Sequence, residues 1–343
     1  RRRRPADERA VREAAQALQA GEPALLLLGG VALQPAALEL AGRIAARTGC
    51  ALMSEFYTAR LARGAGRVIA PRLPYAVEPA LAALAPFRRI VMVGTKRPVA
   101  FFAYPGKPGL LAPPQAQLVT LAEVDQDLDG ALAALAEVLG ASRTPPAGVA
   151  ERAPRPDGAA AFTGALSPEG IGAVLAAHLP EQAIVVDEGV TTGRGLGPAT
   201  VRAAPHDWLT GMGGAIGFGL PTAAGAAIAA PERKVICLEG DGSAMYTPQA
   251  LWTIARENLD VTVLVFANRA YQILRGEFAG VGAGAPGPRA TDMLTLDRPA
   301  LDWCALARGM GVEAVRAEDL GALDAALRNA MARRGPALIE VVL

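Results

Sequence analysis

The sequence has few of the residues from which disulfide scaffolds and metal clusters are built. Its three cysteines, Cys50, Cys237 and Cys304, stand far apart and form no C-x-x-C pair. Their scarcity excludes a disulfide scaffold and a thiolate zinc site, and it is typical of a protein of the reducing cytoplasm. With two histidines, His178 and His206, a histidine-based metal cluster has too few ligands.

The sequence also lacks a surplus of either charge and any long apolar run. Lysine and arginine number 34 against 33 acidic residues, for a net charge of +1, so no excess of positive charge favours nucleic acid as a partner. No apolar stretch approaches the roughly 20 residues of a membrane helix. The basic run at residues 1–4 has no apolar segment behind it and is interpreted as a solvated terminus, not a secretory signal.

The chain does contain enough apolar material for two buried cores. It has 343 residues, of which 52% are hydrophobic and 20% charged, and it is longer than one ordinary domain. In its first half, continuous apolar runs alternate with segments of helical spacing, the pattern of parallel strands covered by helices on both faces. The expected helices are 7–20, 34–47 and 128–139, and the expected strands are 24–28, 89–93 and 117–120.

A proline-rich segment separates the two halves. Residues 141–160 contain four prolines and no apolar periodicity, which predicts an interdomain linker. The second half resumes the alternation, with a first helix that Ser167 would cap. Its expected helices are 168–179, 248–258, 299–309 and 319–333, and its expected strands are 183–187, 234–238, 261–267, 312–315 and 337–342. We therefore predict an α/β protein with two open, mostly parallel, doubly wound sheets, in domains 1–140 and 161–343.

Ligands of such sheets bind beyond the carboxyl ends of the strands, which here are Asp187-Glu188, Glu239-Gly240-Asp241 and Asn268. Asp241 lies between two glycines, and Asn268 ends the next buried strand 27 residues further on. Neighbouring parallel strands would place the two side by side, and their oxygens suit a Mg²⁺ ion held together with phosphate. The alternative is that Gly-Asp-Gly is only a turn, which leaves the strand-end asparagine unexplained.

The run GDGSAMYTPQALWTIARENLDVTVLVFANRAY, residues 240–271, resembles the cofactor motif of thiamine-diphosphate-dependent enzymes, in particular the acetolactate synthase and benzoylformate decarboxylase group. The resemblance implies that Asp241, Asn268 and the backbone carbonyl of Ala270 hold Mg²⁺ against the diphosphate of the cofactor. Many relatives carry two successive asparagines where this chain has Ala267 and Asn268. The other contacts implied for thiamine diphosphate are Gly242, Ser243, Ala244, Met245 and Tyr271.

Two further segments extend the resemblance. GMGGAIGFGLP, residues 211–221, is similar to the stretch that grips the aminopyrimidine ring, which implies that the carbonyl of Gly214 accepts a hydrogen bond and that Ile216 is the apolar wedge under the cofactor. The family has a polar loop that faces the diphosphate after the first strand of this half, here strand 183–187. The resemblance implies that Thr191 and Thr192 in this loop donate hydrogen bonds from their hydroxyl groups. The residues that would line the substrate pocket follow Tyr271, namely Gln272, Ile273 and Leu274.

The implied activity is thiamine-diphosphate- and Mg²⁺-dependent decarboxylation or carboligation of a 2-oxo acid such as pyruvate, as in acetolactate synthase. A simple decarboxylase and a non-catalytic assembly partner are the alternatives. The first half resembles the central domain of these enzymes, which in some binds FAD; no dinucleotide fingerprint occurs here, so a purely structural domain is favoured. The activating glutamate belongs to a pyrimidine-binding domain that has no match in this chain, so no catalytic residue is assigned. We expect a homodimer or homotetramer that needs that domain.

Overall fold

The computed structural model describes residues 3–154 and 162–343. The contacts divide the chain into two units, Arg1–Ala150 and Glu151–Leu343, and the boundary falls within the predicted linker. Residues 155–160 of that linker, and the first two arginines of the basic run, lie outside the described residues. The two units are described separately below.

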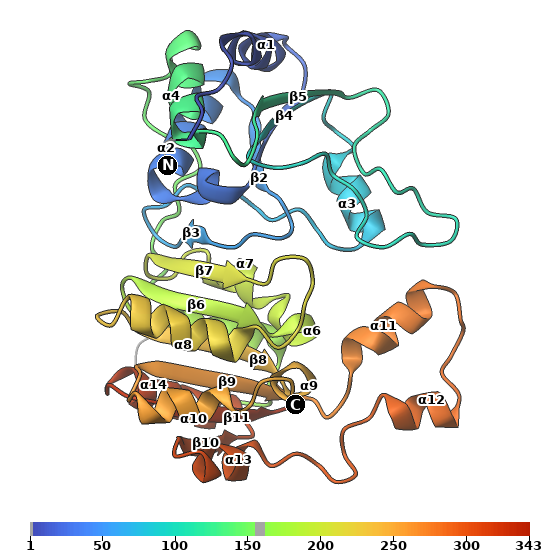
Figure 1. The fold of residues 1–343 in the computed structure, drawn as a ribbon, viewed down its shortest axis with the longest axis vertical. Helices are drawn as coiled ribbons and strands as arrows, with labels where there is room; N and C mark the ends of the chain where they lie inside the picture. Colours follow the sequence, from blue (N-terminus) through green and yellow to red (C-terminus); the bar gives the residue numbers. More distant parts are fainter. Residues whose placement is uncertain (1–2, 155–161) are drawn as a thin grey trace. The chain divides into compact units, whose positions relative to one another are not determined.

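The first unit is a parallel sheet with helices on both faces (Figure 1). Its strands lie in the order β2 (Ala51–Ser54), β1 (Ala24–Leu28), β4 (Arg89–Val93) and β5 (Gln117–Ala122). Leu26 and Leu28 of the central strand pack against the helices α1 (Glu8–Gln19), α2 (Pro35–Thr48) and α4 (Leu128–Val138). Leu25 and Leu27 pack on the other face with α3 (Val77–Leu84). An apolar run that continues without alternation is thus buried on both sides, as predicted.

The structure confirms the expected strands and helices of this half, with ends that differ by one or two residues. It adds two strands, β2 and β3 (Leu61–Arg63), the helix α3 and the short helix η1 (Gly30–Leu33). Strand β2 was not predicted because its four residues ALMS are mostly half-buried, and so short a run gives no periodicity to detect.

The second unit is a larger parallel sheet, again covered on both faces (Figure 1). Its strands lie in the order β10 (Glu313–Ala317), β11 (Ala337–Val342), β9 (Val261–Ala267), β8 (Val235–Gly240), β6 (Ala183–Glu188) and β7 (His206–Thr210). One face packs against the helices α8 (Gly219–Ala229), α10 (Ala250–Arg256) and α13 (Trp303–Gly309). The other packs against α5 (Pro168–His178), α7 (Leu196–Thr200) and α14 (Leu320–Met331). The predicted fold class, two open doubly wound sheets, is confirmed.

Every strand and helix expected in this half is present, although the helix expected over 299–309 begins at Trp303. Ser167 caps α5 by accepting a hydrogen bond from the backbone N–H of Gly170 at 3.1 Å. Strand β7 was missed because its sequence HDWLT starts with two polar residues, both of which are buried. The segment after β6, expected to be a polar loop, begins the short helix α6 (Val190–Gly193) instead. Among the described residues, no helix is long and apolar enough to cross a membrane.

Candidate functional site

The sheet order brings the predicted strand ends together. Strand β8 pairs in parallel with β6 on one side and with β9 on the other, and Gly240 is the register partner of Phe266. Asp241 therefore follows β8 at the same level at which Ala267 and Asn268 end β9. The predicted adjacency of these two strand ends is confirmed, since carboxyl ends of parallel strands share one edge of the sheet.

Asp241 ties the two strand ends together. Its side chain is 3% exposed, and its Oδ1 accepts a hydrogen bond from the backbone N–H of Gly242 at 2.9 Å. Its Oδ2 accepts one from the backbone N–H of Arg269, beyond β9, at 2.6 Å. Burial raises the pKa of Asp241 to about 6, although these two backbone bonds favour the charged form. A cation beside this carboxylate would compensate for the cost of burying its charge.

The turn after β9 is folded tightly around Asn268. The side-chain Oδ1 of Asn268 accepts a hydrogen bond from the backbone N–H of Ala270 at 3.0 Å. Between them Arg269 has a left-handed backbone, with φ of 55°, which non-glycine residues adopt only in special turns. The turn thus joins the amide of Asn268 to the backbone of Ala270, and the N–H of Arg269 between them donates to Asp241. Carboxylate, amide and carbonyl oxygens are the hard ligands that Mg²⁺ prefers.

The segment after Asp241 is a four-residue helix, α9 (Asp241–Ala244), whose residues are all buried. The hydroxyl of Ser243 lies 3.1 Å from the carbonyl of Gly240 and 3.4 Å from that of Glu188, so it is held by the protein itself. The ring of Tyr271 covers Gly242, where a Cβ would lie 2.8 Å from the ring. Only glycine lets the ring approach so closely. Met245, in contrast, is 41% exposed and can meet a ligand.

The Gly-rich segment lies beside the end of β6. Gly213, Gly214 and Gly217 have positive φ angles of 75°, 75° and 86°, which explains why these positions are glycine. Ile216 between them is 46% exposed. The backbone N–H groups of Gly217 and Gly219 both donate to the side-chain carboxylate of Glu188, the second at 2.5 Å.

Glu188 and Glu239 are buried acids for which the sequence predicted no role. They are register partners on β6 and β8, with exposures of 3% and 0%. Burial raises the pKa of Glu188. Burial, and after it the neighbouring charge of Glu188, raises the pKa of Glu239 well above its ordinary value. The thiol of Cys237 lies 3.4 Å from Oε1 of Glu239. A sequence signal for this pair was available, because an acid stands at the carboxyl end of each of two apolar strands.

The remaining predicted residues lie on two helices that contact each other, α6 and α11 (Gln272–Gly280). Thr192 on α6 is buried and Thr191 is half-buried. Gln272 and Leu274 are exposed and Ile273 is half-buried, and no residue of α11 is buried. Figure 1 shows α11 and α12 (Pro288–Met293) extending away from the sheet of the second unit.

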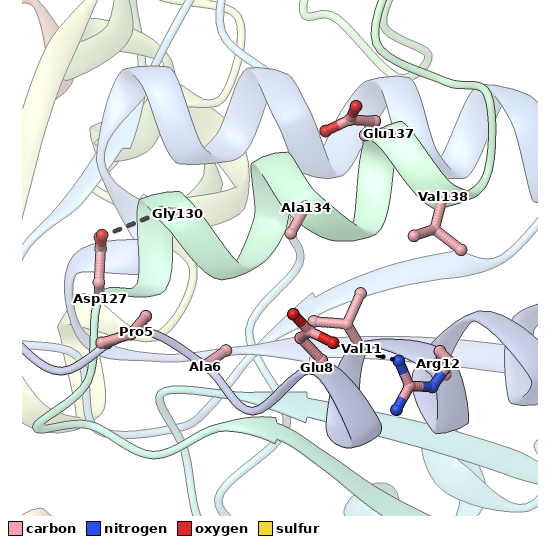
Figure 2. A pocket seen from close by; sticks show the side chains of 10 residues that line it. All are labelled: Pro5, Ala6, Glu8, Val11, Arg12, Asp127, Gly130, Ala134, Glu137 and Val138. Atoms are coloured by element: carbon pink, nitrogen blue, oxygen red, sulfur yellow. Dashed lines mark hydrogen bonds and ion pairs between the residues drawn. The ribbon is translucent and has the colours of Figure 1, made fainter.

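Two other features lie apart from these strand ends. A surface pocket of about 360 Å³ lies in the first unit between α1 and α4, where Glu8 pairs with Arg12 (Figure 2). The acidic side chains of Asp302 and Glu340 gather with Cys304 in the second unit. There Arg316 lies 3.1 Å from Glu340 and 3.6 Å from Asp302, so one guanidinium already pairs with both acids.

Comparison with known proteins assigns the family. Residues 195–341 match the family described as thiamine pyrophosphate enzyme, C-terminal TPP binding domain. This span contains the Gly-rich segment, Asp241 and Asn268. The second unit therefore carries the C-terminal domain of the thiamine-diphosphate-dependent enzyme family, as the motif at residues 240–271 predicted.

Individual relatives show which members of this family the chain is similar to. The chain is 47% identical over 327 residues to the Mycobacterium tuberculosis protein named "Putative acetolactate synthase large subunit IlvX", covering 95% of this chain and 62% of that protein. It is 40% identical over 193 residues to benzoylformate decarboxylase of Pseudomonas aeruginosa, covering 56% of this chain and 35% of that enzyme. The Rhodococcus jostii thiamine diphosphate-dependent 4-hydroxybenzoylformate decarboxylase superposes with a TM-score of 0.74 and 26% identity, over 98% of this chain and 64% of that one. The chain thus spans less than two thirds of the length of these relatives.

Proposed function

We propose that this chain binds thiamine diphosphate and Mg²⁺ at the carboxyl edge of the second sheet and serves in the decarboxylation or carboligation of 2-oxo acids, as in acetolactate synthase. The observation that carries this proposal is that Asp241 and Asn268 follow the carboxyl ends of two neighbouring parallel strands. Both lie within the span that matches the thiamine pyrophosphate binding domain.

The residues present fit the two groups. The donors at the strand ends are a carboxylate, a side-chain amide and backbone carbonyls, which are the ligand types of Mg²⁺ bound together with phosphate. Asp241 is buried and its carboxylate accepts hydrogen bonds from two backbone amides, so a cation would add the counter-charge that a buried carboxylate needs. A Cβ built on Gly213 meets no heavy atom within 4 Å, which leaves open space beside the Gly-rich segment.

Each residue has a role in this proposal. Asp241, Asn268 and the carbonyl of Ala270 would hold the metal ion, and the segment from Gly242 to Met245 would border the diphosphate. The carbonyl of Gly214 and the side chain of Ile216 would orient the ring. When bound, thiamine diphosphate supplies a carbon nucleophile for the 2-oxo acid and accepts the electron pair left by departing CO₂. Gln272 and Ile273 at the start of α11 would border the substrate.

A second surface is needed to complete the site. Around the strand ends several large apolar side chains are exposed, and exposed apolar patches of this kind indicate a partner surface. We propose that a pyrimidine-binding domain covers these apolar side chains and supplies the activating glutamate. The assembly is a homodimer or homotetramer in this proposal. The exposed side chains are Met212, Ile216, Met245, Tyr246 and Leu274.

The first unit serves as a structural domain in this proposal and holds no FAD. At the end of β1, a Cβ on Gly29 would lie 2.4 Å from Oε1 of Glu55 and 2.6 Å from the carbonyl of Gly94. This close packing fills the strand-end position at which a nucleotide would lie in an open sheet. A cytoplasmic location is part of the same proposal, supported by three buried free cysteines.

A simple 2-oxo acid decarboxylase is the second candidate, and the likeness to benzoylformate decarboxylase favours it. Product analysis separates the two. The chain is incubated with Mg²⁺, thiamine diphosphate and either pyruvate or benzoylformate, alone and together with a pyrimidine-binding domain. We expect acetolactate from pyruvate when that domain is present. An aldehyde as the sole product would favour the decarboxylase. Absence of both thiamine-diphosphate binding and turnover in every combination would overturn the proposed function.

A further inference from the structure

The side chain of Glu188 is fully engaged with the Gly-rich segment. Its Oε1 accepts a hydrogen bond from the backbone N–H of Gly217, and its Oε2 accepts one from the backbone N–H of Gly219 at 2.5 Å. A single carboxylate thus binds the backbone amides at the two ends of the turn Gly217–Gly219, which follows Ile216. Hydrogen bonds to a charged acceptor are stronger than those between neutral groups.

The same turn is held from two other directions. The carbonyl of Gly217 accepts a hydrogen bond from the hydroxyl of Thr247 at 2.9 Å. Glu239 lies against Gly219, where a Cβ would come within 2.0 Å of Oε1 of Glu239. The backbone from Gly217 to Gly219 is therefore contacted on more than one side, and Ile216, directly before it, is 46% exposed.

We propose that Glu188 is a positioning residue that fixes this turn and thereby aims Ile216 and the Gly214 carbonyl at the ring of the cofactor, without acting on its diphosphate. The inference rests on the proposed function, because it names what holds the ring-binding side of that site. The side chain of Glu188 binds the Gly-rich segment, whereas the carboxylate of Asp241 accepts from the backbone amides of Gly242 and Arg269.

The chemistry of the turn explains why an acid stands at this buried position. The two N–H groups donate to two different oxygens of one side chain, and a carboxylate has two oxygens where an amide has one. Burying a carboxylate is costly unless it is hydrogen-bonded, and here both oxygens are. Glu188→Gln keeps one acceptor, whereas Glu188→Ala keeps none and leaves two buried donors without a partner.

Hydrogen–deuterium exchange of the complete chain without cofactor tests the clamp directly. In peptides that span residues 211–221, we expect Glu188→Ala to speed exchange at Gly217 and Gly219 by about tenfold or more, with Glu188→Gln intermediate. Glu340→Gln is the matched control, since Glu340 is also a buried strand glutamate, 2% exposed, that accepts from a backbone amide at 3.4 Å. Its exchange over 211–221 should equal that of the unaltered chain. Equal exchange in Glu188→Ala would overturn the clamp.

Ligand titrations test what the clamp positions. With Mg²⁺ present, and with the pyrimidine-binding domain added where binding needs it, we expect Glu188→Ala to weaken thiamine diphosphate about tenfold. Inorganic diphosphate should bind as it does to the unaltered chain. Equal losses for both ligands, or unchanged thiamine-diphosphate affinity, would overturn the positioning role. Failure of the unaltered chain to bind thiamine diphosphate would instead overturn the proposed function, and the ring-positioning role with it.

Discussion

Glu188 and Glu239 are register partners on two neighbouring parallel strands, and their carboxyl groups both reach the backbone of Gly219. A Cβ at Gly219 would lie 2.0 Å from Oε1 of Glu239 and 2.9 Å from Oε2 of Glu188. Helix α8 therefore begins on top of two buried acids, and only a residue without a side chain fits at that first position.

We expect Gly219→Ala to lower the free energy of unfolding by about 1–3 kcal/mol, because the added methyl group must displace a buried carboxylate. Gly225→Ala in the same helix is the control. Nothing lies within 4 Å of a Cβ at Gly225, so this change should stabilise the protein by about 0.5–1 kcal/mol. Denaturant titration of both variants measures the difference. Similar stabilities for the two variants would contradict the packing described at Gly219.

We expect Asp241→Asn to abolish Mg²⁺-dependent binding of thiamine diphosphate while the fold persists. Asparagine fills the same space and can still accept one of the two backbone hydrogen bonds, but it brings no negative charge to the ion. Calorimetric titration with cofactor, with and without Mg²⁺, measures the loss, and circular dichroism checks the fold. Affinity equal to that of the unaltered protein would remove Asp241 from the metal site.

We expect Ile216→Ala to lower turnover on the order of tenfold and to lower cofactor affinity by less. Metal and diphosphate contacts would supply most of the binding energy, whereas the exposed Ile216 side chain would support the reactive shape of the bound cofactor. Steady-state kinetics and a binding titration on the assembled enzyme give the two numbers. Losses of equal size would count against Ile216 as the wedge.

A pH-dependent contribution to stability is expected from Glu55 in the first unit. Burial raises its pKa above the ordinary 4.5, although the hydroxyl of Thr95 donates to its Oε2 at 2.7 Å. A raised pKa means that the folded state binds the proton more tightly than the unfolded state, so this group adds stability as the pH falls through its folded pKa toward 4.5. The variant Glu55→Gln has no carboxyl group at this position, so it lacks this pH-dependent contribution to stability.

The measurement is the melting temperature of both forms between pH 8 and pH 5. The difference between the unaltered protein and Glu55→Gln should shift in favour of the unaltered protein as the pH is lowered. Glu22→Gln is a suitable control, since Glu22 is a surface partner of Arg89. A difference that stays constant over this range would show that the Glu55 pKa is the same in the folded and unfolded states.

The sequence could predict those site residues that stand at the end of an apolar run or beside glycines. The apolar run Val261–Ala267 and the two glycines around Asp241 predicted two strand ends and a close backbone approach, and the structure has both. The fold class followed from the same kind of signal, because strands buried on both faces leave continuous apolar runs. Short elements with mixed composition, such as β2 and β7, gave no such signal.

The sequence by itself determined which residues end the strands, since a buried strand must be apolar along its length and its end is where polar residues and glycine return. Only the tertiary structure decided which of those residues form hydrogen bonds with each other. Glu188 reaches Gly217 and Gly219 across 29 and 31 residues of chain. No periodicity encodes such a contact, because it arises when β6 and β8 are neighbours and α8 starts above both, and that arrangement depends on the packing of the whole sheet.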